Sequence, residues 1–354
     1  MRILQIEPRT NGPVNKDATG GMEQITYLLD KEFFNGGHLT TLIARSASDI
    51  SGKLITIPDQ WNDSQFLSRT DFEEKTVNAF NTFILTQDLS KYDIILNHMS
   101  DIFCYATRIQ EPVVTIYHMS PSFFWDPALG NLPLKNSYFV AVSEHQKNLY
   151  QQAGHPVHKV ITHGIDINAF IPGQKDDYLL FLGRLVPEKG VDIAIDVSIR
   201  TRIPLIIAGA PDSVLTPERE AYQSRIFNAI DNKQIHYVGP ADLSKKKELL
   251  SRARALLVLT QPHNHIQEAS SLVSMEALAS GTPVIATNNG ALPEIVDDGK
   301  TGFIRNSIED LIDAVYSTDF ISSATCRTTA EQRFSSRRMA QQYVQFFQEL
   351  RGGI

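Results

Sequence analysis

The sequence predicts an α/β protein with two doubly wound domains, each a parallel sheet covered by helices on both faces. Short apolar runs alternate with amphipathic segments, and strands buried on both faces read as unbroken hydrophobic stretches. The alternation runs through the first half of the chain and then restarts. The length of 354 residues suits about two domains of roughly 150 residues each.

In the first half, apolar runs between segments of helical periodicity are expected to form one buried sheet. The expected strands are 2–6, 39–44, 92–97, 113–117 and 138–142, and the expected helices lie around 22–35, 71–88 and 144–153.

In the second half the same pattern predicts a second sheet, with strands at 178–183, 204–209, 235–239, 255–260 and 283–287 and helices near 190–200, 216–231, 243–252 and 271–280. Gly281 is expected to end the last of these helices in the left-handed conformation, and Pro283 prevents its continuation.

Polar and turn residues gather at 163–178, so we place the domain boundary there, with domains at 1–168 and 169–335. A final helix at about 336–350 follows a stretch in which we expect no strand. This helix could pack on either domain.

The overall composition argues against several classes of protein. The net charge of −7 opposes nucleic-acid binding, and no segment reaches the roughly 18 apolar residues of a membrane span. The N-terminus lacks the apolar stretch of a signal peptide, and Cys104 and Cys326 are far apart, as expected for reduced thiols. We therefore expect a cytoplasmic protein.

Local basic clusters occur at 245–254 and 337–338. They are typical of solvated helix faces, and peripheral contact with the anionic inner face of a membrane stays open as the alternative.

Ligands of open parallel sheets bind at the carboxyl ends of the strands, and two such domains favour a site in the cleft between them. Arg184 directly follows the strand 178–183, and Lys189 lies at the start of the next helix. Two cations beside a helix N-terminus form a site for a phosphate group. The alternative is a surface pair with Glu188.

The loop 7–24 joins the first strand to its helix and contains Gly20 and Gly21. Glycines let a phosphate or sugar approach the backbone amides closely. The spacing is not GxGxxG, which counts against a dinucleotide-dependent dehydrogenase. An ordinary loop-to-helix turn remains the alternative.

Several histidines invite a functional interpretation. His118 follows the strand 113–117, where it is either a catalytic group or a structural hydrogen-bonding residue, and 163–166 is expected to be a turn. His263 and His265 precede Glu268, but no further residue completes a zinc-ligand spacing, so no metal site is expected.

Two carboxylates flank the start of the helix near Ser271, with Glu268 before it and Glu276 inside it. Ser270 or Ser271 can cap this helix, whose free amides can face a diphosphate. A carboxylate can accept hydrogen bonds from the vicinal hydroxyls of a sugar or ribose. We expect each glutamate to bind a hydroxylated ring on one side of the diphosphate. The alternative for Glu276 is an internal salt bridge.

These residues resemble the retaining GT-B glycosyltransferases of glycosyltransferase family 4, over nearly the whole chain and most strongly at 163–304. The motifs are Glu268-x7-Glu276 with ALASGTPVIAT, GRLVPEKG (183–190), HGIDINAF (163–170), GALPEIVDDGKTGF (290–303) and GGMEQITYLLDKEFFNGGH (20–38). The resemblance implies a GT-B fold in which two Rossmann-like domains face each other across a cleft, and a terminal helix (336–354) that crosses back onto the first domain.

The resemblance also implies roles for individual residues. The donor diphosphate would be bound by Arg184, Lys189 and the amides of Leu272 and Val273. Glu276 would hold the ribose, and Glu268 would hold the transferred sugar. From the other domain, Gly20 and Gly21 would approach the phosphates, and His118 would lie near the donor sugar. One departure is Ser270-Ser271, where the family has Phe-Gly. It implies either a narrower site or a serine that donates a hydrogen bond to the donor.

We therefore expect a transferase that moves a hexose-type sugar from a nucleotide diphosphate sugar, UDP rather than GDP, to a hydroxyl of a sugar, glycan, lipid or small molecule. Retention of configuration is implied by the resemblance, and no metal or other cofactor is expected. The alternatives are a sugar phosphorylase or nucleotide-sugar epimerase of the same fold, or a nucleotide-sugar-binding subunit with little catalysis.

Overall fold

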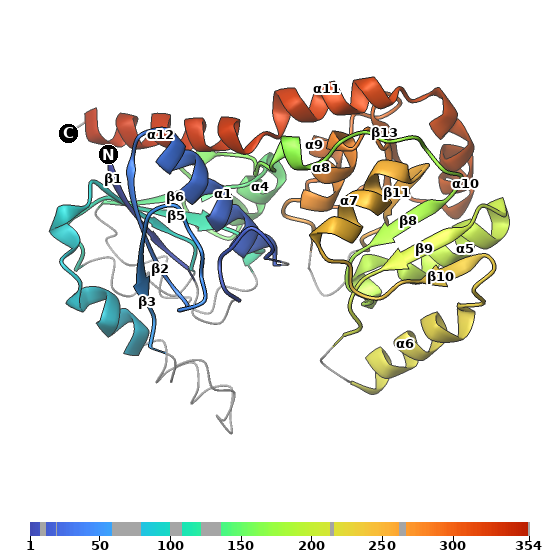
Figure 1. Cartoon of the computed structure of the whole chain (residues 1–354), viewed down its shortest axis with the longest axis horizontal. Helices are drawn as coiled ribbons and strands as arrows, with labels where there is room; N and C mark the ends of the chain where they lie inside the picture. The colour runs from blue at the N-terminus through green and yellow to red at the C-terminus, as the bar shows by residue number, and fades with distance from the viewer. Residues whose placement is uncertain are drawn as a thin grey trace. The chain divides into compact units, whose positions relative to one another are not determined.

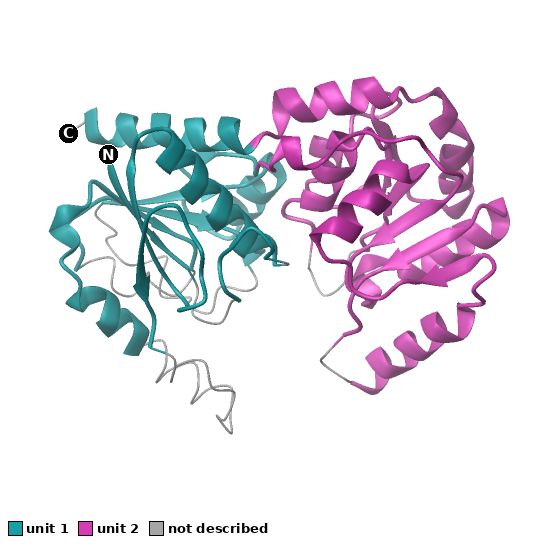
Figure 2. Cartoon of the chain, in the orientation of Figure 1, with its two compact units in different colours: residues 1–163, 336–354 teal, residues 164–335 magenta. Residues whose placement is uncertain are grey.

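A computed structural model describes residues 1–7, 12–18, 20–58, 79–99, 108–121, 136–212, 216–261 and 267–352. The chain divides into two compact units (Figure 2). Unit 1 comprises residues 1–163 and 336–354, and unit 2 comprises residues 164–335.

Unit 1 is built on a seven-stranded parallel sheet with the order β3-β2-β1-β4-β5-β6-β7. Its strands are β1 (Arg2–Ile6), β2 (Leu39–Ala44), β3 (Lys53–Thr56), β4 (Ile94–Asn97), β5 (Val113–Tyr117), β6 (Ser137–Ala141) and β7 (Lys159–Val160). Its helices include α1 (Gly21–Asn35), α4 (Glu144–Gln152), α12 (Ser336–Gly352) and the short η2 (Leu89–Lys91).

Helix α12 lies beside α1 (Figure 1). The Phe33 and Phe347 rings are 5.9 Å apart, and the Ser336 hydroxyl donates to Glu32 Oε1 at 2.7 Å. The chain terminus thus contributes a covering helix to unit 1.

Unit 2 is built on a six-stranded parallel sheet with the order β10-β9-β8-β11-β12-β13. Its strands are β8 (Leu179–Leu182), β9 (Leu205–Ala208), β10 (Ile235–Tyr237), β11 (Ala255–Val258), β12 (Val284–Ala286) and β13 (Gly302–Ile304). Its helices are η5 (Ile167–Ala169), η6 (Pro187–Lys189), α5 (Val191–Thr201), α6 (Pro217–Ala229), α7 (Leu243–Arg252), α8 (Leu272–Ala279), α9 (Leu292–Ile295), α10 (Ile308–Ser317), η7 (Thr318–Phe320) and α11 (Ser323–Arg333).

The unit 2 sheet has a hydrophobic core on each face. Alternate residues of one strand point to opposite faces, so Leu180 of β8 packs with α7, α8 and α11, while its neighbours Leu179 and Phe181 pack with α5, α6 and α10. This double burial explains why the strands read as unbroken apolar runs.

The doubly wound α/β class is confirmed, and every predicted strand is present. Of the predicted helix 71–88, the described residues 79–86 are helical. The expectation of no strand before the last helix was wrong, because β13 pairs with β12 there. Only three residues long and led by a glycine, β13 carries too little apolar periodicity to be recognised. Gly281 has φ +67° after α8, as predicted.

Candidate functional site

Each sheet reverses its strand order at one point, and ligands of such sheets bind beyond the strand ends there. In unit 2 the reversal lies between β8 and β11, and in unit 1 it lies between β1 and β4. Candidate residues follow these strands in each unit.

Arg184 follows β8 after Gly183 and is exposed. Within the described ranges it forms no ion pair or side-chain hydrogen bond. The alternative pairing with Glu188 was wrong, because buried Glu188 instead accepts from Arg219 at 3.3 Å. Arg184 therefore remains a cation available to a ligand.

Lys189 ends the short helix η6, and its ammonium group contacts Glu268. The distance from Nζ to Glu268 Oε2 is 2.7 Å, and the Thr260 hydroxyl donates to the same oxygen at 3.2 Å. The two side chains are 31% and 13% exposed. The structure thus brings together two residues that were expected to bind neighbouring parts of one donor, Lys189 the diphosphate and Glu268 the sugar.

The backbone of Glu268 is fixed by the segment after β12. Glu268 N donates to Asn289 Oδ1 at 3.0 Å, and Ala291 N donates to Glu268 O at 2.8 Å. Gly290 has φ +57°, and a Cβ there would lie 2.1 Å from Glu268 O. Only glycine fits this approach. Asn289 was not assigned from the sequence, and Gly290 was noted only as the first residue of the motif 290–303.

The N-terminus of α8 has no side-chain cap. Ser271 occupies the N-cap position, but its hydroxyl pairs with Ser274 Oγ at 2.7 Å instead of a backbone amide. The expected capping by Ser270 or Ser271 was therefore wrong, and Ser270 Oγ is buried without a hydrogen-bond partner among the residues described. The amides of Leu272 and Val273 thus receive no capping side chain, and such a helix start attracts anions.

Glu276 is buried on α8 and forms an ion pair with Lys246 of α7. The distance from Lys246 Nζ to Glu276 Oε1 is 2.5 Å, and Nζ also lies 5.6 Å from the centre of the Phe170 ring. Burial raises the pKa of Glu276, and the Lys246 charge opposes that rise. The internal salt bridge considered for Glu276 is thus present, and it engages one of the two carboxylate oxygens.

In unit 1, His118 follows β5 and belongs to a cluster of three histidines. His98 Nδ1 lies 3.1 Å from His118 Nε2, and the ring of His118 stacks on those of His98 and His163 with 5.3 Å between centres in each case. Burial lowers the pKa of His98 to about 3 and that of His163 to about 4. These imidazoles are neutral at physiological pH. His98 was missed from the sequence, although it directly follows the predicted strand 92–97 just as His118 follows the strand 113–117.

Helix α1 begins at Gly21, and Gly20 occupies its N-cap position. Because glycine has no side chain, Gly20 cannot cap the first amides of the helix. The Glu23 carboxylate reaches back and accepts from Gly12 N at 2.9 Å. A negative charge therefore already faces the first turn of α1, which is a less favourable place for a phosphate than the start of α8.

The remaining candidates are two histidines and the two cysteines. His263, His265 and Cys104 lie outside the described residues, and within them no group of histidine, cysteine and acidic side chains could hold a metal ion. Burial raises the pKa of the Cys326 thiol to about 12, so this cysteine is not a nucleophile.

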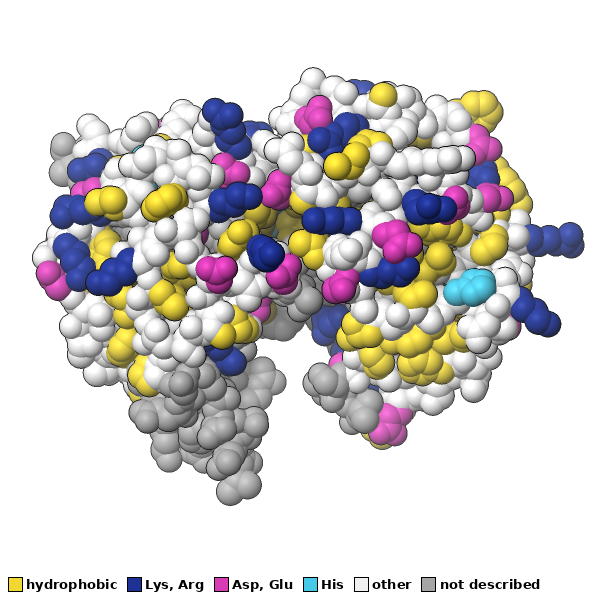
Figure 3. Space-filling view, in the orientation of Figure 1, with side chains coloured by type: hydrophobic (Ala, Val, Ile, Leu, Met, Phe, Trp, Pro, Cys, Tyr) yellow, Lys and Arg dark blue, Asp and Glu magenta, His cyan; other side chains and the backbone are white. Residues whose placement is uncertain are grey.

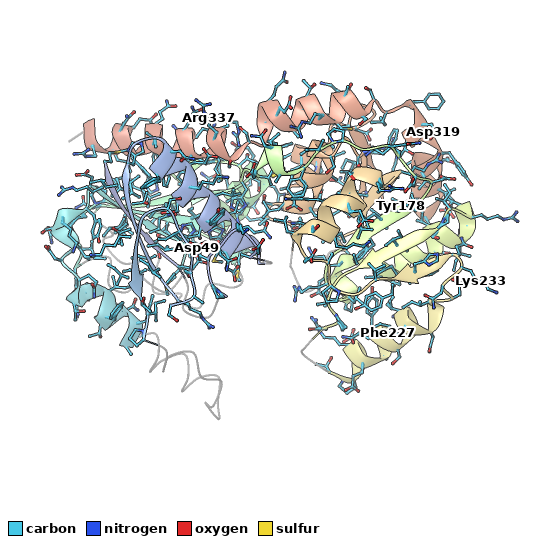
Figure 4. The ribbon with its side chains drawn as sticks, in the orientation of Figure 1. Asp49, Tyr178, Phe227, Lys233, Asp319 and Arg337 are labelled. Atoms are coloured by element: carbon cyan, nitrogen blue, oxygen red, sulfur yellow. The ribbon has the colours of Figure 1, made fainter. Side chains whose placement is uncertain are left out.

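Several of the basic residues at 245–254 are engaged in ion pairs, with Lys245 held by Glu248 and Arg252 by Asp176. On the face shown in Figure 3, lysine and arginine side chains are interspersed with acidic ones. Arg337 is exposed on α12 (Figure 4). Among the described residues, no helix combines the length and apolar character needed to cross a bilayer.

Comparison with known proteins adds to this geometry. Residues 166–318 match the family described as "Glycosyl transferases group 1". The D-inositol 3-phosphate glycosyltransferase of Saccharomonospora viridis is 28% identical over 230 residues, which are 57% of this chain and 52% of that protein. The chain spans 38% to 52% of the lengths of this and two further curated relatives.

Solved structures are similar over the whole chain. Sucrose-phosphate synthase from Thermosynechococcus elongatus has a TM-score of 0.80 at 18% identity, covering 100% of both chains. Anabaena HepE in complex with UDP and glucose has a TM-score of 0.69 at 18% identity, covering 99% of this chain and 100% of that one. At this identity the similarity establishes the fold, and the predicted GT-B class is confirmed.

Proposed function

Because residues 166–318 match the glycosyl transferases group 1 family, we propose that this chain is a glycosyltransferase. The donor is a nucleotide diphosphate sugar carrying a hexose-type sugar, with UDP favoured over GDP. The acceptor is a hydroxyl group, and the configuration at the anomeric carbon is retained.

The arrangement around the start of α8 carries this proposal. Exposed Arg184, the Lys189–Glu268 pair and an uncapped helix N-terminus lie beyond the two strands where the sheet order reverses. Cations and free amides suit a diphosphate, while a carboxylate suits the hydroxyls of a sugar. A site with both kinds of group fits a donor that carries both.

The same groups can promote the departure of the nucleoside diphosphate. Negative charge grows on the leaving phosphate as the bond to the sugar breaks, and Arg184, Lys189 and the α8 amides would stabilise it. Fixed donors of this kind are worth about 2.7–4 kcal/mol each in an oxyanion hole. Since this chain's own cations would balance the diphosphate charge, we expect transfer without a divalent metal.

The second glutamate would serve the ribose. Lys246 pairs with Glu276 Oε1 and opposes the rise in pKa that burial causes, which favours the charged carboxylate and leaves Oε2 to accept from a ribose hydroxyl. An ionised acceptor forms stronger hydrogen bonds than a neutral one.

The test is calorimetric binding of a panel of nucleotide sugars, followed by transfer assays with the best donor. Arg184→Ala and Lys189→Ala should each weaken donor binding and turnover by at least about tenfold, as expected for losing a charge-assisted hydrogen bond. The control is Arg200→Ala, which breaks an exposed pair with Asp196 on α5. Full activity in either site variant would refute the phosphate assignment. Phosphate-dependent cleavage without a nucleotide sugar would instead identify a phosphorylase.

A further inference from the structure

A buried polar chain in unit 1 links Glu7, after β1, to His118, after β5. The Thr26 hydroxyl of α1 donates to Glu7 Oε2. Thr26 Oγ1 lies 3.2 Å from His98 Nδ1, and the same nitrogen lies 3.1 Å from His118 Nε2. Glu7, Thr26 and His98 are 1%, 0% and 2% exposed, so water does not mediate these contacts.

The protons in this chain have defined positions because the imidazoles are neutral. Burial lowers the pKa of His98 to about 3, and burial together with the two neighbouring histidines holds the pKa of His118 well below its usual value. A neutral imidazole carries one N–H and one lone pair, so each contact has one donor and one acceptor.

The direction of the chain is set at Thr26. Its single hydroxyl proton is engaged by the Glu7 carboxylate, so its oxygen can only accept from His98 Nδ1. His98 must then carry its proton on Nδ1, from which it also reaches His118 Nε2.

The far side of His98 fits this direction once the Gln5 amide is turned over. His98 Nε2 lies 3.2 Å from Gln5 Oε1, and Gln5 Nε2 is buried without a hydrogen-bond partner among the described residues. A half rotation of the amide exchanges its oxygen and nitrogen, and the nitrogen then donates to the lone pair on His98 Nε2. This orientation pairs the amide donor, which is the costlier group to leave unpaired.

We propose that Glu7, Thr26 and His98 are positioning residues that hold His118 as the neutral tautomer with its proton on Nδ1. His118 Nε2 accepts from His98, which leaves Nδ1–H as the donor offered to a ligand. Among the described residues, none forms a hydrogen bond with His118 Nδ1. The rings of His98 and His163, stacked 5.3 Å from that of His118, fix the plane in which this donor lies.

The natural ligand group for such a donor is an oxygen of the reacting sugar. This part of the inference rests on the proposed glycosyltransferase function, whereas the tautomer itself does not.

The tautomer is measured by nitrogen-15 and carbon-13 NMR of histidine-labelled full-length protein, with resonances assigned from His98→Gln and His118→Gln variants. We expect His98 and His118 of the wild type to be protonated on Nδ1. Thr26→Val keeps the shape but removes the oxygen that sets the direction, so the Nδ1–H form should lose its preference and the Nε2–H form, with His98 donating to Gln5 Oε1, should become populated at both histidines. Thr26→Ser should preserve the wild-type form.

Thr40→Val is the matched control, because Thr40 is also buried in unit 1 and its hydroxyl has no hydrogen-bond partner among the described residues. It should leave both tautomers unchanged. An Nε2–H form of His118 in the wild type would overturn the proposal without any variant. So would unchanged tautomers in folded Thr26→Val protein.

A transfer assay then tests the use of the donor. Thr26→Val should lower kcat by about tenfold, the size of one lost hydrogen bond, with little change in the donor KM, while Thr26→Ser and Thr40→Val stay near wild type. A changed tautomer with unchanged kcat would refute the role in transfer. If no transfer is found in any form, the proposed function fails while the NMR result still decides the tautomer.

Discussion

Replacing Lys246 by methionine should make the stability of the protein fall with rising pH. Methionine keeps most of the aliphatic stem that lies near Phe170 but removes the charge paired with Glu276. The side chains of this pair are 12% and 4% exposed, so water cannot replace the lost ammonium group. Glu276 must then either remain as an unpaired buried charge or take up a proton.

The sign follows from the two protonation states. Burial raises the pKa of Glu276 already in the wild type, and loss of Lys246 removes the interaction that opposes the rise. Below the usual carboxyl pKa, Glu276 is protonated in the folded and unfolded chains alike, so the variant loses little stability there. Above it, unfolding releases a proton, and stability falls by at most about 1.4 kcal/mol per pH unit. Near neutral pH the loss should reach about 3 kcal/mol, the usual effect of breaking a buried pair.

The assay is chemical denaturation at pH 5, 6, 7 and 8, monitored by circular dichroism, which gives the free energy of unfolding at each pH. Lys245→Met is the control, because Lys245 on the same helix pairs with Glu248 at an exposed site, with side chains 43% and 57% exposed. Its effect should stay below about 0.5 kcal/mol at every pH. Adding Glu276→Gln to Lys246→Met should remove the pH dependence. Curves for Lys246→Met that run parallel to wild type from pH 5 to 8 would refute the reasoning.

Glu268→Gln should reduce transfer strongly. Binding of free nucleoside diphosphate, measured by calorimetry, should stay equal or tighten by a few-fold, because the variant frees Lys189 from its carboxylate partner. Equal losses in transfer and in binding would mean that Glu268 is only structural. Ser271→Ala should change the melting temperature little, because the Ser271 hydroxyl does not cap α8. Asp242→Ala removes the side-chain cap of α7 and should lower the stability by about 1 kcal/mol. A larger loss of stability in Ser271→Ala than in Asp242→Ala would contradict the uncapped start of α8. Gly290→Ala should impair both folding and transfer, because the new Cβ would collide with the Glu268 backbone. Thermal melting and donor turnover measure these two effects. Wild-type values in both would show that the close contact between Gly290 and Glu268 is dispensable.

The fold was largely predictable because burial on both faces leaves a direct trace in the sequence. A strand such as β11 is apolar at every position, and such a short run between turn residues is typical of a strand buried on both faces. Helices α10 and α11 were not predicted, and the strands that were missed are short or lie at an edge. β7 has two residues and β3 is only half-buried, so neither needs a continuous apolar run.

The site was predictable only as far as chain order determines position. Arg184 could be placed because it directly follows a buried strand, and the start of α8 could be placed by the same logic. The ion pairs between these side chains could not be predicted in this way. Lys189 and Glu268 are 79 positions apart, and Lys246 and Glu276 are 30 apart, so their contacts depend on how the helices pack. The Ser271–Ser274 contact escaped prediction for another reason, since a serine at an N-cap usually bonds the backbone.

In the described structure of unit 2, both glutamates proposed to bind rings are held by lysines. These two pairs differ in a way that bears on how a donor would bind. The Lys189–Glu268 pair is the more exposed, and a diphosphate would compete with Glu268 for the same ammonium group. The Lys246–Glu276 pair is nearly buried and uses one carboxylate oxygen, so it can persist while the other oxygen accepts from a ribose. Donor binding would then exchange the partner of Lys189 and release Glu268 for the sugar at the moment the phosphates arrive. The Glu268→Gln variant bears directly on this exchange, because weaker binding of free nucleoside diphosphate by that variant would mean that the carboxylate does not compete.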